Sequence, residues 1–191
     1  MNRWKTAFFV LAGALVFILV IIIYLATKPA PDVPLPVVEE EAAGGVLVVQ
    51  TTTKEFEAIA KKYLGDALKD SPFPVDLSID EDIRIDSEIA VFYTHIPITL
   101  HFEPIIDDNG NIRLKQTKMN VGLLNIPPET TLKLMNDSID FPSWVVVRPN
   151  DSEIFIDLSR LNIASGSRVR AKELDLPNNR ILLEIIVPTD K

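Results

Sequence analysis

The sequence predicts an α+β fold that follows an N-terminal transmembrane helix, and three observations lead to this prediction. An uncharged stretch of twenty residues, Ala7–Ala26, is long enough at about 1.5 Å per residue to cross about 30 Å of hydrocarbon. A segment from about Thr53 to Lys69 has apolar residues at helical spacing. From Val75 onward the apolar residues follow a period of two, which indicates antiparallel strands.

The apolar stretch predicts a single-pass protein of the cell membrane. Residues 1–6 are expected in the cytoplasm, because Arg3 and Lys5 precede the stretch and only Lys28 follows it closely. Residues 27–45 are rich in proline and glutamate and predict an extended linker, after which residues 46–191 form an extracytoplasmic domain. The alternative is a cleaved signal peptide, whose apolar core would be unusually long.

Composition excludes several classes of function. The chain contains no cysteine, so disulfides, thiolate metal sites and thiol nucleophiles are absent. After Lys28 there are 16 basic and 27 acidic residues, and this negative balance argues against binding to nucleic acid. None of the seven glycines lies in a phosphate-binding motif, and no cofactor is expected.

The first elements of the domain are a short strand and an amphipathic helix. The run Val46–Val49 predicts the strand. Thr52 and Glu55 have the spacing of a capping box at the start of the helix. The apolar stripe of this helix consists of Phe56, Ile59, Ala60, Tyr63, Leu64, Ala67 and Leu68.

The next strands show a change in their alternation. Apolar residues occupy odd positions between Val75 and Tyr93, with a turn near Asp80–Asp82, and even positions between Ile96 and Phe102. This change of phase predicts a bulge or a sharp bend near Thr94–Pro97.

The rest of the chain predicts hairpins and a second, short helix. The "DDNG" turn at 107–110 should return the chain into a strand at Ile112–Val121, and a short helix should start near Pro128. Two further hairpins are predicted, with strands at 144–148 and 154–158 and at 168–176 and 180–187.

No residue pattern indicates catalysis. His101 and Glu103 share one face of a predicted strand, but a third partner for a metal or an acid–base site is not evident. No serine-hydrolase motif occurs. We therefore expect no catalytic residue, no metal site and no enzymatic activity.

Two candidate binding surfaces remain. The helix stripe could line an apolar groove against the bent sheet; this candidate groove consists of Phe56, Ile59, Tyr63, Leu64, Ile96, Ile98 and Leu100. The same residues could equally form a filled core. A candidate basic stripe consists of Arg168, Arg170 and Lys172, which share strand parity and could meet lipid headgroups, anionic wall polymers or the domain's own acidic residues.

The chain resembles the YpmS-like family of Gram-positive membrane-anchored proteins from about Val46 to Pro188. The resemblance depends on "TTKE" at 52–55, "HFEP" at 101–104, "NGNIRLK" at 109–115, "MNVG" at 119–122, "PSWV" at 142–145, "IFIDL" at 154–158 and "RAKELDLPNNRI" at 170–181. It implies a single membrane segment and an extracytoplasmic domain, and it brings no catalytic residues.

Together these observations predict a non-enzymatic domain that binds a hydrophobic or lipid-like ligand of the cell envelope. The alternative is a scaffold that docks an envelope enzyme or a secretion component. An enclosed cavity would favour the lipid, and a large exposed apolar patch would favour the protein partner.

Overall fold

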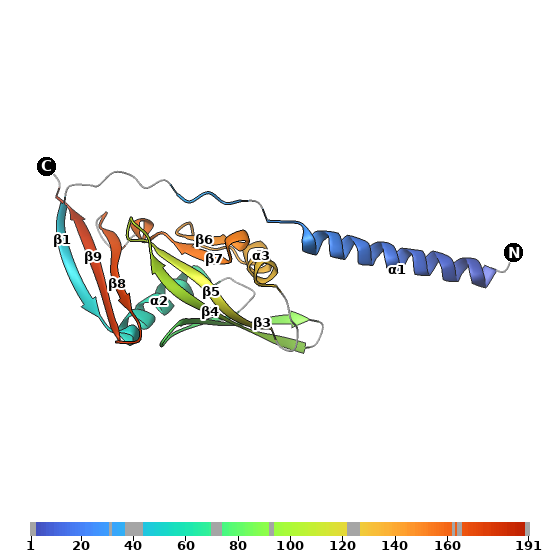
Figure 1. Cartoon of the computed structure of the whole chain (residues 1–191), viewed down its shortest axis with the longest axis horizontal. Helices are drawn as coiled ribbons and strands as arrows, with labels where there is room; N and C mark the ends of the chain where they lie inside the picture. Colours follow the sequence, from blue (N-terminus) through green and yellow to red (C-terminus); the bar gives the residue numbers. More distant parts are fainter. Residues whose placement is uncertain are drawn as a thin grey trace. The chain divides into compact units, whose positions relative to one another are not determined.

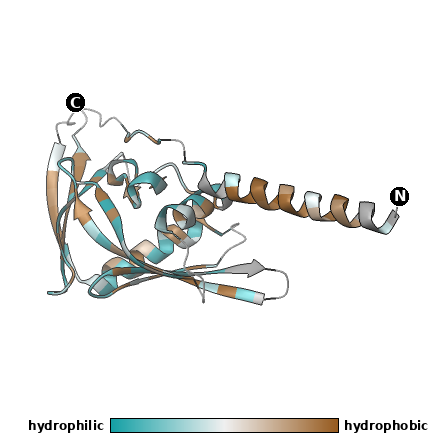
Figure 2. Cartoon of the chain, turned by 45° about the vertical axis from the view of Figure 1, so that its right-hand side comes forward, coloured by the Kyte–Doolittle hydropathy of each residue, from teal (hydrophilic) through white to brown (hydrophobic). Residues whose placement is uncertain are grey.

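The computed structural model describes residues 3–30, 32–36, 44–69, 74–91, 94–121, 127–161, 163 and 166–189. Met1–Pro31 and Asp32–Lys191 form two separate compact units. The predicted linker lies partly outside the described residues, at 31 and 37–43. The first unit contains the helix α1 (Arg3–Thr27), which Figure 2 shows to be largely apolar. No helix in the described part of the chain is both long enough and apolar enough to cross a membrane.

The second unit confirms the α+β class. It combines antiparallel strands with the helices α2 (Thr53–Ala67) and α3 (Pro128–Ser138). Its strands are β1 (Gly44–Thr51), β2 (Val75–Ile79), β3 (Ile83–Val91), β4 (Thr94–Ile106), β5 (Ile112–Val121), β6 (Val145–Arg148), β7 (Glu153–Ile156), β8 (Arg168–Asp175) and β9 (Arg180–Pro188). Two 3₁₀ turns, η1 (Pro149–Asp151) and η2 (Leu158–Arg160), flank β7. The predicted strands, hairpins and short helix are therefore present.

The strands form two sheets and not the single bent sheet that the sequence predicted (Figure 1). One sheet has three strands in the order β1-β9-β8, so that the first and last strands of the domain pair with each other. The other has six strands in the order β2-β3-β4-β5-β7-β6. Every described strand pair is antiparallel, as the period-two pattern predicted.

The predicted bend near Thr94–Pro97 is wrong. Val91 and Thr94 are opposite each other in an antiparallel pair, so the chain reverses between β3 and β4. Reversal of the chain explains why the apolar residues change from odd to even positions. The irregularity in β4 lies instead between His101 and Phe102, where the pairing with β5 shifts by one residue.

Helix α2 begins where its capping box predicted. The Thr52 hydroxyl accepts a hydrogen bond from the backbone N–H of Glu55 at 3.3 Å, and the Glu55 carboxylate accepts one from the backbone N–H of Thr52 at 3.2 Å. These bonds satisfy N–H groups that have no partner within the helix. The helix ends at Ala67, two residues before the predicted end.

The turn between β4 and β5 joins the two sheets. The Gly110 carbonyl accepts a hydrogen bond of 2.7 Å from the backbone N–H of Ala171 in β8. Gly110 has a φ of +80°, and a Cβ atom there would lie 2.7 Å from the Cβ of Arg170. Glycine is needed here because both its left-handed backbone and its close contact with β8 exclude a side chain.

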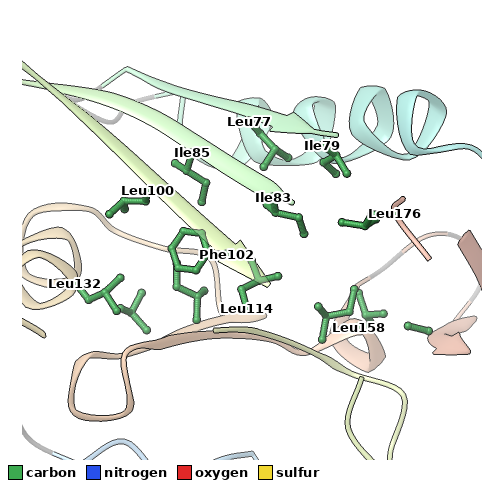
Figure 3. Close-up of a cluster of buried hydrophobic side chains, with 14 of the residues drawn as sticks. Leu77, Ile79, Ile83, Ile85, Leu100, Phe102, Leu114, Leu132, Leu158 and Leu176 are labelled. Atoms are coloured by element: carbon green, nitrogen blue, oxygen red, sulfur yellow. The ribbon is translucent and has the colours of Figure 1, made fainter. Parts of the chain in front are cut away.

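One contiguous hydrophobic core joins the two sheets and α3. Figure 3 shows Phe102 and Leu100 of β4 close to Leu132 of α3. Phe102, Leu132 and Ile181 of β9 are fully buried. The core therefore draws on residues as far apart in the sequence as Leu77 and Ile181.

Candidate functional site

An apolar cleft of about 200 Å³ lies beneath helix α2, and we call it the α2 cleft. One wall is the apolar stripe of the helix, with Phe56, Ile59, Ala60, Tyr63, Leu64 and Leu68. The opposite walls come from both sheets, from α3 and from the segment after it. They include Leu77, Ile79, Ile83, Ile85, Ile112, Leu114, Met135, Phe141, Trp144, Ile154, Val169 and Leu183. No charged side chain is among the described lining residues.

The cleft has an exposed mouth and a buried floor. Ile59 and Tyr63 of α2 and Ile163 are solvent-exposed, although all three are apolar or aromatic. Ile154 of β7 and Val169 of β8 line the floor and are buried. Such a site offers hydrophobic contact and almost no hydrogen bonding, which suits a hydrocarbon group.

The structure places the residues of the candidate groove in two different environments. Phe56, Ile59, Tyr63 and Leu64 line the α2 cleft, as the helix stripe suggested. Ile98 and Leu100 are buried in the core, and Ile96 packs against it. These three residues of β4 do not belong to the described lining of the cleft, because α2 packs mainly against β2 and β9.

The facing wall was therefore missed, although its residues carry a signal in the sequence. Leu77, Ile79, Ile83 and Ile85 lie on the apolar face that the alternation of residues 75–93 marks. Alternation identifies the residues that point inward, but it does not identify the strand that lies beside the helix.

Polar contacts hold α2 to both sheets. The backbone N–H and the hydroxyl of Thr53 donate hydrogen bonds of 2.8 and 2.7 Å to Oδ1 of Asn179, in the turn between β8 and β9. One turn later, Oε2 of Glu57 accepts a hydrogen bond of 2.8 Å from the backbone N–H of Ile79, at the end of β2. These bonds attach the first turns of α2, the helix that lines the cleft, to both sheets.

Contacts with Ile79 and Lys61 favour the ionised form of Glu57. The hydrogen bond from the Ile79 N–H lowers the pKa of Glu57, and Lys61, 3.0 Å away, lowers it further. A lowered folded-state pKa stabilises the fold above the unfolded pKa of about 4.3, and this stabilisation is lost as the pH falls through the lowered value.

We expect this contact to make stability depend on pH. The melting temperature of Glu57→Gln should lie below that of the wild type at pH 7, and the gap should narrow as the pH falls below about 4.3. Thermal unfolding at several pH values measures both effects. Asp66→Asn, which removes an exposed charge from the same helix, controls for the change in net charge. A gap that stays constant down to pH 3 would contradict the role of Glu57.

The candidate basic stripe lies outside the cleft. Arg168 and Arg170 are opposite Ile186 and Glu184 in the sheet register, on the face away from the buried Val169. Lys172 forms an ion pair of 2.6 Å with Glu184. At least part of the stripe is thus directed at the domain's own acidic residues, which was one of the partners considered from the sequence.

His101 and Glu103, the candidate pair, have different neighbours in the structure. Nδ1 of His101 lies 2.8 Å from Oδ2 of Asp82, in the turn between β2 and β3. Glu103 is opposite Lys115 of β5. The described residues contain no group of three metal-ligating side chains close enough to hold one ion.

The sequence of the chain is similar to those of known bacterial proteins. Residues 2–187 match the family described as "Uncharacterized protein conserved in bacteria (DUF2140)". The chain is also 31% identical over 181 residues to the uncharacterized protein YpmS of Bacillus subtilis (strain 168), and the match covers 95% of each chain. The resemblance seen in the sequence is therefore confirmed. No solved structure matches the chain.

Proposed function

The chain belongs to the DUF2140 family of bacterial proteins, and we propose that it is a membrane-anchored, non-enzymatic domain outside the cytoplasm that binds an acyl chain of an envelope lipid. The α2 cleft is the observation that carries this proposal. Its volume of about 200 Å³ and its apolar walls compare with an engineered apolar cavity of about 150 Å³ that stays dry and binds benzene. A hydrocarbon segment is the ligand that such walls favour.

The proposed anchor is the stretch Ala7–Ala26, which contains no charged residue. It lies within α1, whose 25 residues correspond to about 37 Å at about 1.5 Å each. The proposal of an anchor depends on the whole stretch Ala7–Ala26. Within it, the structure describes the side chains without a break from Phe8 to Tyr24. Arg3 and Lys5 before the stretch favour a cytoplasmic N-terminus.

The second candidate is a scaffold that docks an envelope protein. The observation that favours it is strand β1, an edge strand with the exposed apolar side chains of Val46, Leu47, Val48 and Val49. Edge strands of this kind pair readily with other chains, because their backbone groups have no partner on one side.

Filling the cleft should abolish lipid binding. Ala60 lines the α2 cleft and Ala58 is exposed on the same helix, so Ala60→Phe and Ala58→Phe make the same change inside and outside the site. We expect native mass spectrometry to find one acyl lipid on residues 32–191 purified from bacterial cells. Ala60→Phe should lower its occupancy about tenfold or more, equivalent to about 1.4 kcal/mol of binding free energy, and Ala58→Phe should not.

Residues 32–191 suit this measurement because they form one compact unit that contains the whole described core. Thermal unfolding of each variant checks the fold. In a filled core Ala60→Phe would overpack and destabilise the domain by about 1–3 kcal/mol. Lipid-free wild-type protein combined with that loss of stability would reject the lipid and favour the scaffold.

A further inference from the structure

The apolar surface of the α2 cleft continues onto strand β1. Val169 of β8 and Leu183 of β9 line the cleft. Directly opposed residues of antiparallel strands lie on the same face of a sheet. The register places Ile185 opposite Val169 and Leu47, and places Leu183 opposite Val49. Leu47, Val49 and Ile185 therefore extend the cleft wall outward, and we call these three residues the inner track.

The two faces of this sheet differ in charge. On the inner face, the two rows that cross the three strands contain only apolar residues, namely Leu47, Ile185 and Val169, and Val49, Leu183 and Ala171. On the outer face, the corresponding rows contain Arg168, Arg170 and Glu184. The inner track thus presents an uncharged surface that is continuous with the cleft, whereas the outer face of the same sheet carries charged residues.

The inner track is open to solvent at its outer end. Leu47 is 58% exposed, and Ile185 does not belong to the core cluster or to the residues packed against it. The three strands lie about 4.8 Å apart, so the track carries the apolar surface about 10 Å outward from β8. Its occupant is therefore apolar, elongated and able to enter the cleft at one end.

We propose that one long acyl chain of a membrane phospholipid places its terminal segment in the α2 cleft and its middle segment on the inner track. This inference rests on the proposed function and specifies its ligand. A cleft close in size to a benzene-binding cavity holds only part of a long chain, so the remaining methylene groups need an adjoining apolar surface. The headgroup stays outside, since the described cleft lining contains no charged side chain.

Other occupants fit this surface less well. A protein helix is about 10 Å across and could not continue from the track into the cleft. A strand from a second copy would pair with the backbone edge of β1 and would not distinguish the inner face from the outer face. A matched comparison of the two faces of β1 therefore separates these possibilities.

The test uses the full chain in bacterial membranes whose phospholipids carry a photoreactive acyl chain. One probe carries the reactive group at the end of the chain, and a second carries it in the middle. After irradiation, mass spectrometry of peptides locates the cross-links. We expect the terminal probe to label α2 within Phe56–Leu64 and the middle probe to label Leu47, Val49 and Ile185. Cross-links in α1 report contact of the proposed anchor with the bilayer.

Two double variants compare the faces of β1. Leu47→Asp with Val49→Asp places charge on the inner track, and Val46→Asp with Val48→Asp places the same charges on the outer face of the same strand. All four side chains are exposed, Val46, Leu47 and Val48 at 55–59% and Val49 at 38%, so both variants should fold, as protease resistance will check. The inner variant should lose middle-probe labelling of Ile185 about tenfold, and the outer variant should keep it.

Each outcome has a distinct meaning. Labelling of α2 by the terminal probe without labelling of the inner track would overturn this inference and leave the proposed function in place. Labelling of α1 alone would reject both. Equal losses in the inner and outer variants would also overturn the inference, because they would indicate strand pairing with another chain or contact of β1 with the bilayer.

Discussion

Replacing Phe102 with alanine should lower the free energy of unfolding by about 3–5 kcal/mol. Phe102 is fully buried in β4, where Figure 3 shows it near Leu114 and Leu132. Its ring fills space between the six-stranded sheet and α3, and neighbouring side chains in a closely packed core relax only partly into a new cavity. Denaturant unfolding monitored by circular dichroism measures the effect.

Ile105→Ala provides the control for Phe102, because Ile105 lies on the same strand and is exposed. Ile105→Ala should lower the free energy of unfolding by less than about 1 kcal/mol. The cleft residue Ile59, which is also exposed, should behave like Ile105 in the absence of ligand. A small effect of Phe102→Ala, comparable with that of Ile105→Ala, would show that the region around α3 repacks freely and would contradict the described core.

Glu153→Gln should lower the free energy of unfolding by about 2–3 kcal/mol. The Glu153 side chain is 1% exposed and accepts hydrogen bonds from Arg113 at 2.6 Å and from Arg148 at 2.5 Å. Hydrogen bonding to Glu153 raises the pKa of the Arg113 guanidinium. Removal of the carboxylate leaves two arginines without their buried counter-ion. They are 39% and 23% exposed, so water compensates in part and the loss falls below that for a fully buried pair.

Asp151→Asn is the matched control for Glu153. Asp151 also pairs with Arg148, at 2.5 Å, but its side chain is 47% exposed. Exposed ion pairs contribute little, and we expect a change within about 0.5 kcal/mol. Equal effects of the two variants in urea unfolding would contradict the importance of burial. We also expect a dependence on salt concentration, because screening by salt should weaken the exposed Asp151 ion pair more than the buried Glu153 ion pairs.

The elements of this fold were predictable because each depends on neighbouring residues. The capping box of Thr52 and Glu55, the stripe of α2 and Pro128 at the start of α3 all act within a few residues of the chain. The turn at 107–110 likewise depends on Asp107 and Gly110. Helix capping and turn geometry are local interactions, and their spacing in the sequence is their spacing in the structure.

The pairing of elements was much less predictable. The change of alternation after Tyr93 was interpreted as a bend, although the chain reverses there, because both arrangements change which positions face inward. Strand β1 finds its partner in β9, more than a hundred residues later, and nothing in the Val46–Val49 run specifies that choice. Apolar strands with similar patterns are interchangeable until the whole core forms.

The sequence by itself determined the α+β class, the positions of the helices and strands, the membership of the family, and the helix residues that line the cleft. Only the tertiary structure decided that α2 faces β2 and β9 and not Ile96, Ile98 and Leu100 of β4. It also decided that Glu153 is buried between two arginines. Periodicity records which side of an element is apolar, whereas the element that covers that side is selected by packing between distant parts of the chain.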